Sequence, residues 1–219
     1  ERLYDFHNVA LSPIQSLFLN IAILSIIVIS LIRSERSLRD QSQWAMLFLL
    51  AVFGVSGRIL LDPIPNVQPV TVLVLLAGAY FGAPRAIALA AIIALASNAM
   101  LLGHGPWTLF QAIGWGGVAL VGAISANRIV VEGNVRIGLL AVIAAICGLA
   151  FNWFVSLSIL LDVGPSMLIP YLLNGLAFDL YHVAGNVLFV AWMASPLGDM
   201  MHRHRSSPSF EAVRDRAPN

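Results

Sequence analysis

The stretch VTVLVLLAGAYFGAPRAIALAAIIALASNAMLL, residues 70–102, decides the fold class, because it is apolar almost throughout and Arg85 is its single charged residue. A membrane span needs about 20 mostly apolar residues. Gly82-Ala83-Pro84 interrupts the stretch, so we expect two short spans there, over 68–82 and 85–102. Working outward, further spans are expected over 12–32, 43–61, 107–127, 136–161 and 168–195. The sequence therefore predicts seven spans, with short connections that make consecutive helices antiparallel neighbours.

The composition of the whole chain agrees with this pattern. Of the 219 residues, 59% are hydrophobic and only 11% are charged, whereas a soluble domain has about 25% charged residues. So few charges cannot cover the surface of a domain of this size in water. The composition excludes a soluble enzyme, a nucleic-acid-binding protein and a disordered chain, and it predicts an all-α polytopic membrane protein.

Missing residue types exclude several kinds of chemistry. The chain contains no lysine, so it has no Walker-type phosphate loop, Schiff-base lysine or Ser-Lys catalytic pair. Cys147 is the single cysteine, which excludes an internal disulfide and a cysteine-based metal cage. We also expect no catalysis, no intrinsic cofactor and no metal site. Any use of ATP would depend on another chain.

The arginines predict the orientation through the positive-inside rule. If the N-terminus is outside, only Arg2 and Arg58 lie at or near the outer side, and Arg58 is expected to snorkel or to pair with Asp62. The others then lie on the cytoplasmic side: Arg33, Arg36, Arg39, Arg85, Arg128, Arg136, Arg203, Arg205, Arg214 and Arg216. We therefore predict an N-out, C-in topology, with a signal-anchor helix first and a polar cytoplasmic tail over residues 199–219.

The last predicted span carries a polar stripe. Gly175, Asp179, His182 and Asn186 are spaced i, i+4, i+7 and i+11, which places them on one face of a helix. Asp179 and His182 are i, i+3 neighbours and can pair directly. Such a pair can be structural, but an ionisable residue inside a membrane is a functional-site hypothesis by default.

Other polar and aromatic residues gather towards the predicted outer side. Some lie in the loops before the third and fifth spans, and others one or two turns inside a span. Singly, an asparagine can be a contact between helices and a tryptophan can belong to the interfacial belt. Their concentration on one side instead predicts a polar and aromatic cup open to the outside. Its members are Asn66, Gln68, His104, Trp107, Thr108, Gln111, Trp115 and Asn152, with Asp179, His182 and Asn186 of the stripe.

A competing motif is Gly54-Val55-Ser56-Gly57, which matches the GxSG of rhomboid intramembrane proteases and would pair Ser56 with His182. Four whole spans separate the two residues. Ser56 is also expected near the outer end of its helix and His182 near mid-membrane. This protease is the less favoured alternative.

Four separated blocks resemble a known family. They are Gly57-Arg58 with Pro65-Asn66-Val67-Gln68-Pro69-Val70-Thr71; Ser97-Asn98; Gly105-Pro106-Trp107-Thr108-x-x-Gln111 with Trp115-Gly116; and Phe178-Asp179-Leu180-x-His182-x-x-Gly185-Asn186. In this order they resemble the substrate-binding S components of energy-coupling factor (ECF) vitamin transporters, especially the cobalamin-type branch.

The resemblance implies a six-helix S-component-like core over residues 43–198 in the membrane of a prokaryotic cell. Residues 1–42 would add one N-terminal transmembrane helix and a basic cytoplasmic loop, a departure from the family. The core would capture a vitamin from outside and release it inward, working with a transmembrane coupling subunit and two ATPase subunits. Loops 62–69 and 103–107 would gate the cup.

The resemblance also implies the ligand and the docking face. Cobalamin is large, amide-rich and partly apolar, which suits Asn and Gln beside Trp walls, and His104 or His182 could approach its cobalt. Ala45, Ala51 and Gly54 would form the face that docks on the coupling subunit, although Ala45 is followed by Leu49 and Ala51 by Val55, so this small-residue face is incomplete. The class-distinct alternative is an accessory or structural subunit of another membrane complex that retains the fold without transport.

Overall fold

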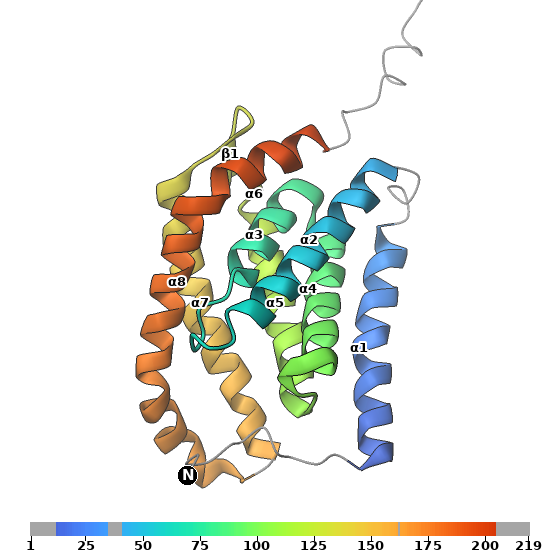
Figure 1. The fold of residues 1–219 in the computed structure, drawn as a ribbon, viewed down its shortest axis with the longest axis vertical. Helices are drawn as coiled ribbons and strands as arrows, with labels where there is room; N and C mark the ends of the chain where they lie inside the picture. The colour runs from blue at the N-terminus through green and yellow to red at the C-terminus, as the bar shows by residue number, and fades with distance from the viewer. Residues whose placement is uncertain (1–11, 35–40, 162, 205–219) are drawn as a thin grey trace, which may run out of the picture.

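The computed structural model describes residues 12–34, 41–161 and 163–204, which form a helical bundle with one small hairpin (Figure 1). Six of the described helices are long and apolar enough to cross a membrane, as expected for an all-α polytopic membrane protein. The helices are α1 (Pro13–Arg33), α2 (Gln41–Leu60), α3 (Val70–Phe81), α4 (Ala83–Ser97), α5 (Pro106–Ile124), α6 (Ala126–Ile129), α7 (Ile137–Ser156) and α8 (Leu168–Arg203); β1 (Val130–Val131) and β2 (Asn134–Val135) form the hairpin.

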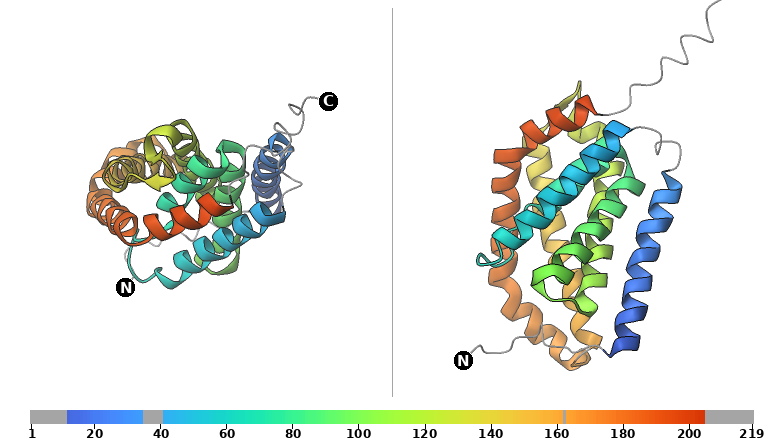
Figure 2. Two further views of the ribbon diagram at one scale, coloured as in Figure 1. Left: turned by 90° about the horizontal axis from the view of Figure 1, so that it is seen from above. Right: turned by 45° about the vertical axis from the view of Figure 1, so that its right-hand side comes forward.

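The third predicted span, 68–82, is a short central helix instead. α3 has 12 residues, a length of about 18 Å against a hydrocarbon core of about 30 Å. Every one of its residues is buried, and the views in Figures 1 and 2 place it inside the bundle. The described part of the chain thus has six helices of span length and a shorter apolar one that is enclosed by protein.

α3 and α5 approach each other at two glycines. A methyl group built on Gly78 would overlap the carbonyl oxygen of Ala119, and one built on Gly122 would overlap the carbonyl oxygen of Leu75. Small residues let two helix backbones come close and gain dispersion contacts, which is how helices associate without a hydrophobic driving force. These two glycines therefore determine the position of α3 in the bundle.

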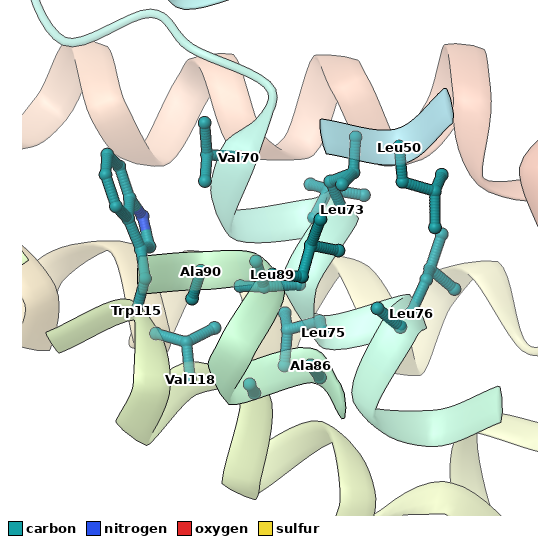
Figure 3. Packing of buried hydrophobic residues seen from close by; sticks show 14 of the residues in the cluster. Leu50, Val70, Leu73, Leu75, Leu76, Ala86, Leu89, Ala90, Trp115 and Val118 are labelled. Atoms are coloured by element: carbon teal, nitrogen blue, oxygen red, sulfur yellow. The ribbon is translucent and has the colours of Figure 1, made fainter. Parts of the chain in front are cut away.

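The remaining core is packed around this contact. Figure 3 shows Leu73, Leu75 and Val118 meeting the alanines of α4, with Trp115 at the edge of the cluster. Ala86, Ala90, Ala91 and Ala94 on α4 are fully buried, so the alanine-rich stretch serves close helix packing, as its composition suggests.

α8 is longer than the predicted span 168–195. It continues through Pro196 to Arg203, and Figure 1 shows its last turns bending across one end of the bundle. Gly198 and Met201 on these turns are buried, and Gly198 lies against Val135 of β2 and Tyr80 of α3. Residues 199–203 are therefore packed helix and not the start of the predicted tail; residues 205–219 lie outside the described part.

The described arginines with a predicted cytoplasmic position share one end of the bundle. Each lies at or beside the end of a helix, in α1, α4, α6, α7 and α8 in turn: Arg33, Arg85, Arg128, Arg136 and Arg203. We call this the arginine-rich end. Arg2, Arg36, Arg39, Arg205, Arg214 and Arg216 lie outside the described residues. α1 begins with a capping box of Ser12 and Gln15 and packs beside α4 on the outside of the bundle (Figure 2).

Substituting Gly122→Ala should lower the thermal unfolding temperature of the detergent-purified protein, because the new methyl group overlaps backbone that cannot yield. Overpacking of this kind costs about 1–3 kcal/mol. Gly117→Ala on the same helix is the matched control, since nothing lies within 4 Å of its added methyl group, and it should be neutral or stabilising. Equal effects of the two substitutions would contradict the close contact between α3 and α5.

Candidate functional site

The polar stripe of α8 faces the bundle. Asp179, His182 and Asn186 are buried, whereas their neighbours Leu180 and Tyr181 are 70% and 53% exposed. This burial confirms the helical face that the spacing predicted. A carboxylate and an imidazole away from water need hydrogen-bond partners, and the partners come mostly from other helices.

Asn152 of α7 connects the two ionisable groups of the stripe. Its Nδ2 donates to Asp179 Oδ1 at 2.9 Å, and its Oδ1 lies 2.7 Å from His182 Nδ1. Trp153 Nε1 donates to Asp179 Oδ2 at 2.9 Å. The direct pairing of Asp179 with His182 expected from their spacing is therefore replaced by a bridge, because Asn152 offers a donor to one group and an acceptor to the other.

The bridge determines the tautomer of His182. An amide oxygen only accepts, so His182 Nδ1 carries the proton, and in the neutral ring Nε2 is then an acceptor. Nε2 lies 3.1 Å from Thr71 Oγ1, and Thr71 Oγ1 accepts from Trp115 Nε1 at 3.3 Å. The Thr71 hydroxyl then donates to Nε2. The hydrogen bonds form a series from Trp115 through Thr71, His182 and Asn152 to Asp179, and each is donated in the direction of Asp179.

Two aromatic rings pack together beside this series of hydrogen bonds. Phe151 of α7 stacks on Trp115 with a centroid distance of 4.4 Å and an interplanar angle of 17°, and it lies 5.6 Å from the His182 ring. A methyl group on Gly114 would come within 2.9 Å of Phe151. The glycine therefore lets α5 and α7 close over the site and keep it apolar around its hydrogen bonds.

Trp115 also contacts Arg58, which is only 3% exposed. The arginine neither snorkels to the surface nor forms the expected contact pair with Asp62. Its Nε donates to Gln68 Oε1 at 3.0 Å, and its Nη1 donates to Asn98 Oδ1 at 3.0 Å and to Ser97 Oγ. The guanidinium also lies 4.9 Å from the ring centroid of Trp115, a cation–π distance.

Asn98 extends the hydrogen bonds into α5. Its Nδ2 donates to Thr108 Oγ1 at 2.9 Å and to Gln111 Oε1 at 2.7 Å. Asn98 begins a π-helical segment, Asn98–Leu102, that follows α4. Such segments are rare and occur frequently at functional sites.

The loop between α2 and α3 reaches the site because two glycines make room for it. Pro69 lies over Gly57, where a methyl group would come within 2.6 Å of the proline ring, and Val67 lies against Gly185 of α8. Asn66 has a positive φ of 58°, a conformation that asparagine tolerates, and its Nδ2 donates to the Phe178 carbonyl at 3.5 Å. This path brings Gln68 to Arg58.

Together these contacts define one connected set of side chains, which we call the polar network. It includes predicted members of the cup and five residues that the site prediction had not included: Arg58, Thr71, Ser97, Asn98 and Trp153. Its full membership is Arg58, Gln68, Thr71, Ser97, Asn98, Thr108, Gln111, Trp115, Asn152, Trp153, Asp179 and His182. The additional residues carried a signal, since four of them lie in or beside the sequence blocks that define the resemblance.

Four predicted cup residues are not members of the network: Asn66, whose bond to the Phe178 carbonyl is described above, and Asn186, Trp107 and His104. Asn186 donates to the Ala144 carbonyl at 3.2 Å, and its Oδ1 is buried without a partner among the described residues. Trp107 Nε1 donates to the Gly103 carbonyl at 3.2 Å within its own loop. Both ring nitrogens of His104 are buried and unpartnered within the described part of the chain. The unpartnered atoms of Asn186 and His104 are available to a further molecule.

The α2 residues predicted for other roles lie apart from the network. Ser56 is exposed, while the two ring nitrogens of His182 contact Thr71 and Asn152, so neither is directed at Ser56. Gly54 is buried against Ile93 of α4, where a methyl group would come within 2.5 Å. Ala45 is exposed and Ala51 half-buried, so these two remain for the predicted docking face.

The chain belongs to a family of unknown function, DUF6580, which matches residues 38–206. The match begins before α2 and includes every helix that contributes to the polar network, whereas α1 precedes it. No curated protein and no solved structure matches the chain.

Substituting Thr71→Val should destabilise the protein, because it retains the shape of the side chain but leaves Trp115 Nε1 and His182 Nε2 without their partner. A buried polar group left unpaired costs about 1–3 kcal/mol. Thr71→Ser keeps the hydroxyl and should lower the thermal unfolding temperature less. A valine variant as stable as the serine variant would show that the hydroxyl does not connect the two rings.

Stability should fall in acid partly through His104. Desolvation lowers the pKa of this loop histidine below its ordinary value of 6.5, so near that pH the unfolded chain binds a proton that the folded chain does not. Stability from this group is fully present above the ordinary pKa and is lost as the pH falls from there through the lowered pKa of the folded state. Unfolding temperatures at pH 7.5 and pH 5 should therefore differ less for His104→Gln than for the wild type; an unchanged difference would refute the effect.

Proposed function

We propose that this member of DUF6580 is a membrane subunit that binds a vitamin, in the manner of the S components of ECF importers. Cobalamin or a related corrinoid is the leading ligand, by the resemblance of the four sequence blocks. The observation that carries the proposal is the polar network. Side chains from α2, α4, α5, α7, α8 and the loop before α3 converge on one place in an otherwise apolar bundle.

A purely structural role explains this convergence less well. Interhelical hydrogen bonds in membranes contribute only about 0.6 kcal/mol on average, so stability does not require so many buried polar groups. Amides such as Asn98 and Gln111 can exchange their mutual hydrogen bonds for those of a bound molecule. The stacked rings of Trp115 and Phe151 offer an apolar wall beside them, which is the usual composition of a ligand site.

Transport would need partners, because the chain has no lysine for a Walker-type phosphate site. We propose that a transmembrane coupling subunit and two ATPase subunits supply the energy. Ala45 and Ala51 on α2 are the candidate docking residues. In this proposal the arginine-rich end faces the cytoplasm of a prokaryotic cell, with the N-terminus outside and the C-terminus inside, and the vitamin enters from the opposite side.

The second candidate is an accessory or structural subunit that keeps the fold without transport. One observation favours it, since most groups of the polar network have their hydrogen-bond partners within the network itself. Ligand binding separates the two candidates.

Calorimetric titration of the detergent-purified protein with cyanocobalamin tests the proposal. Asp179→Ala and Gln111→Ala should weaken binding about tenfold or more, because each removes a charged or amide partner from the network. Asn20→Ala on α1, outside the network, is the control and should bind as the wild type does. Equal effects of all three would refute the site, and binding of neither cobalamin nor any other vitamin would refute the transport role.

A further inference from the structure

The environment of Arg58 suggests what kind of group the site recognises. Within the described residues its hydrogen bonds go to Gln68, Ser97 and Asn98, whose oxygens are all neutral. Asp62, whose charge acts on Arg58 from a distance, is exposed on the turn after α2. The buried guanidinium thus has no carboxylate in hydrogen-bond contact among the described side chains.

The buried carboxylate of the site, that of Asp179, has hydrogen-bond donors other than Arg58. Both oxygens of Asp179 accept hydrogen bonds, from Asn152 and Trp153. Between the two charges stand the neutral groups of Trp115, Thr71 and His182. Opposite charges attract strongly where the dielectric constant is low, so this arrangement keeps a cation available that a direct ion pair would neutralise.

The neutral partners hold the guanidinium ready for an anion. Ser97 and Asn98 extend from α4 and the π-helical segment, and the Trp115 face stabilises the cation from one side. Gln68 differs from them, because the loop before α3 carries it. Displacing Gln68 Oε1 frees Arg58 Nε without moving a helix, and an anionic oxygen forms a stronger hydrogen bond there than an amide oxygen does.

We propose that Arg58 is the recognition group for an oxyanion, a carboxylate or a phosphate, carried by the soluble molecule that the site binds. This inference rests on the proposed function and narrows it to anionic ligands. The phosphodiester of cobalamin and the carboxylates of smaller vitamins both qualify.

Matched ligand pairs test the inference in the full chain in detergent. The close pairs are pantothenate with panthenol and biotin with biotinamide. A coarser third pair is cyanocobalamin with dicyanocobinamide, which lacks the whole nucleotide including the phosphodiester. In the pair that binds, the anionic member should bind about 10- to 100-fold more tightly to the wild type. Arg58→Gln should abolish that preference, and Arg58→Lys should retain part of it. Arg128→Gln, an exposed arginine at the arginine-rich end, should leave it unchanged.

A second arm does not depend on a vitamin. Inorganic phosphate and acetate, compared with chloride at equal ionic strength, should raise the unfolding temperature of the wild type but not of Arg58→Gln. If this glutamine variant does not fold, the wild-type pairs and Arg58→Lys decide the question.

The outcomes separate the two proposals. Equal binding of charged and neutral members would overturn the oxyanion inference and leave vitamin binding intact. Stabilisation by phosphate or acetate through Arg58, with no vitamin bound, would support the oxyanion site and refute the transport role.

A response only to phosphatidylglycerol in mixed micelles would overturn the inference in favour of a lipid headgroup. No response in either arm would overturn both proposals.

Discussion

The backbones of α3 and α5 touch at Gly78 and Gly122, and the rest of the bundle depends on that contact. It places a helix too short to span a membrane in the centre of the protein. Thr71 in the first turn of α3 then lies between Trp115 and His182. With larger residues at the two glycines, α3 would move away from α5 and this connection between α5 and α8 would break.

A second constraint is the low dielectric constant of the interior, where each polar group needs a partner. The polar network meets it through alternation of donors and acceptors. Amide side chains are suited to this, since each offers both. Asn152 joins an anion to an imidazole, and Asn98 joins a cation to two further oxygens. Each of the two asparagines therefore links one charged group to neutral side chains without a direct ion pair.

Much of the architecture could be predicted from the sequence because apolar stretches and helical spacing are local signals. The burial of Asp179, His182 and Asn186 on one face is an example. The partners of those residues could not be predicted in the same way, since Asn152 is brought to Asp179 only by the packing of α7 against α8. Spacing within one helix favoured a direct contact between Asp179 and His182, and the competing amide replaced it.

Arg58 and the end of α8 show the same limit. An arginine near the end of a span is expected to snorkel, but the loop returns over Gly57 and covers it. Pro196 suggests the end of a helix, yet the turns beyond it remain helical because Gly198 and Met201 pack on the bundle. In both cases tertiary contacts overruled a local rule. The function that the resemblance implies and the roles of the site residues remain predictions.

The length of α8 has a mechanical consequence. It is one continuous helix of 36 residues, with a length of about 54 Å measured along its bent axis. Asp179 and His182 lie in its first half, while Gly198 and His202 contact the hairpin at the arginine-rich end. Because both sets of contacts belong to one helix, a displacement of α8 at Asp179 and His182 would also shift its contacts at the arginine-rich end.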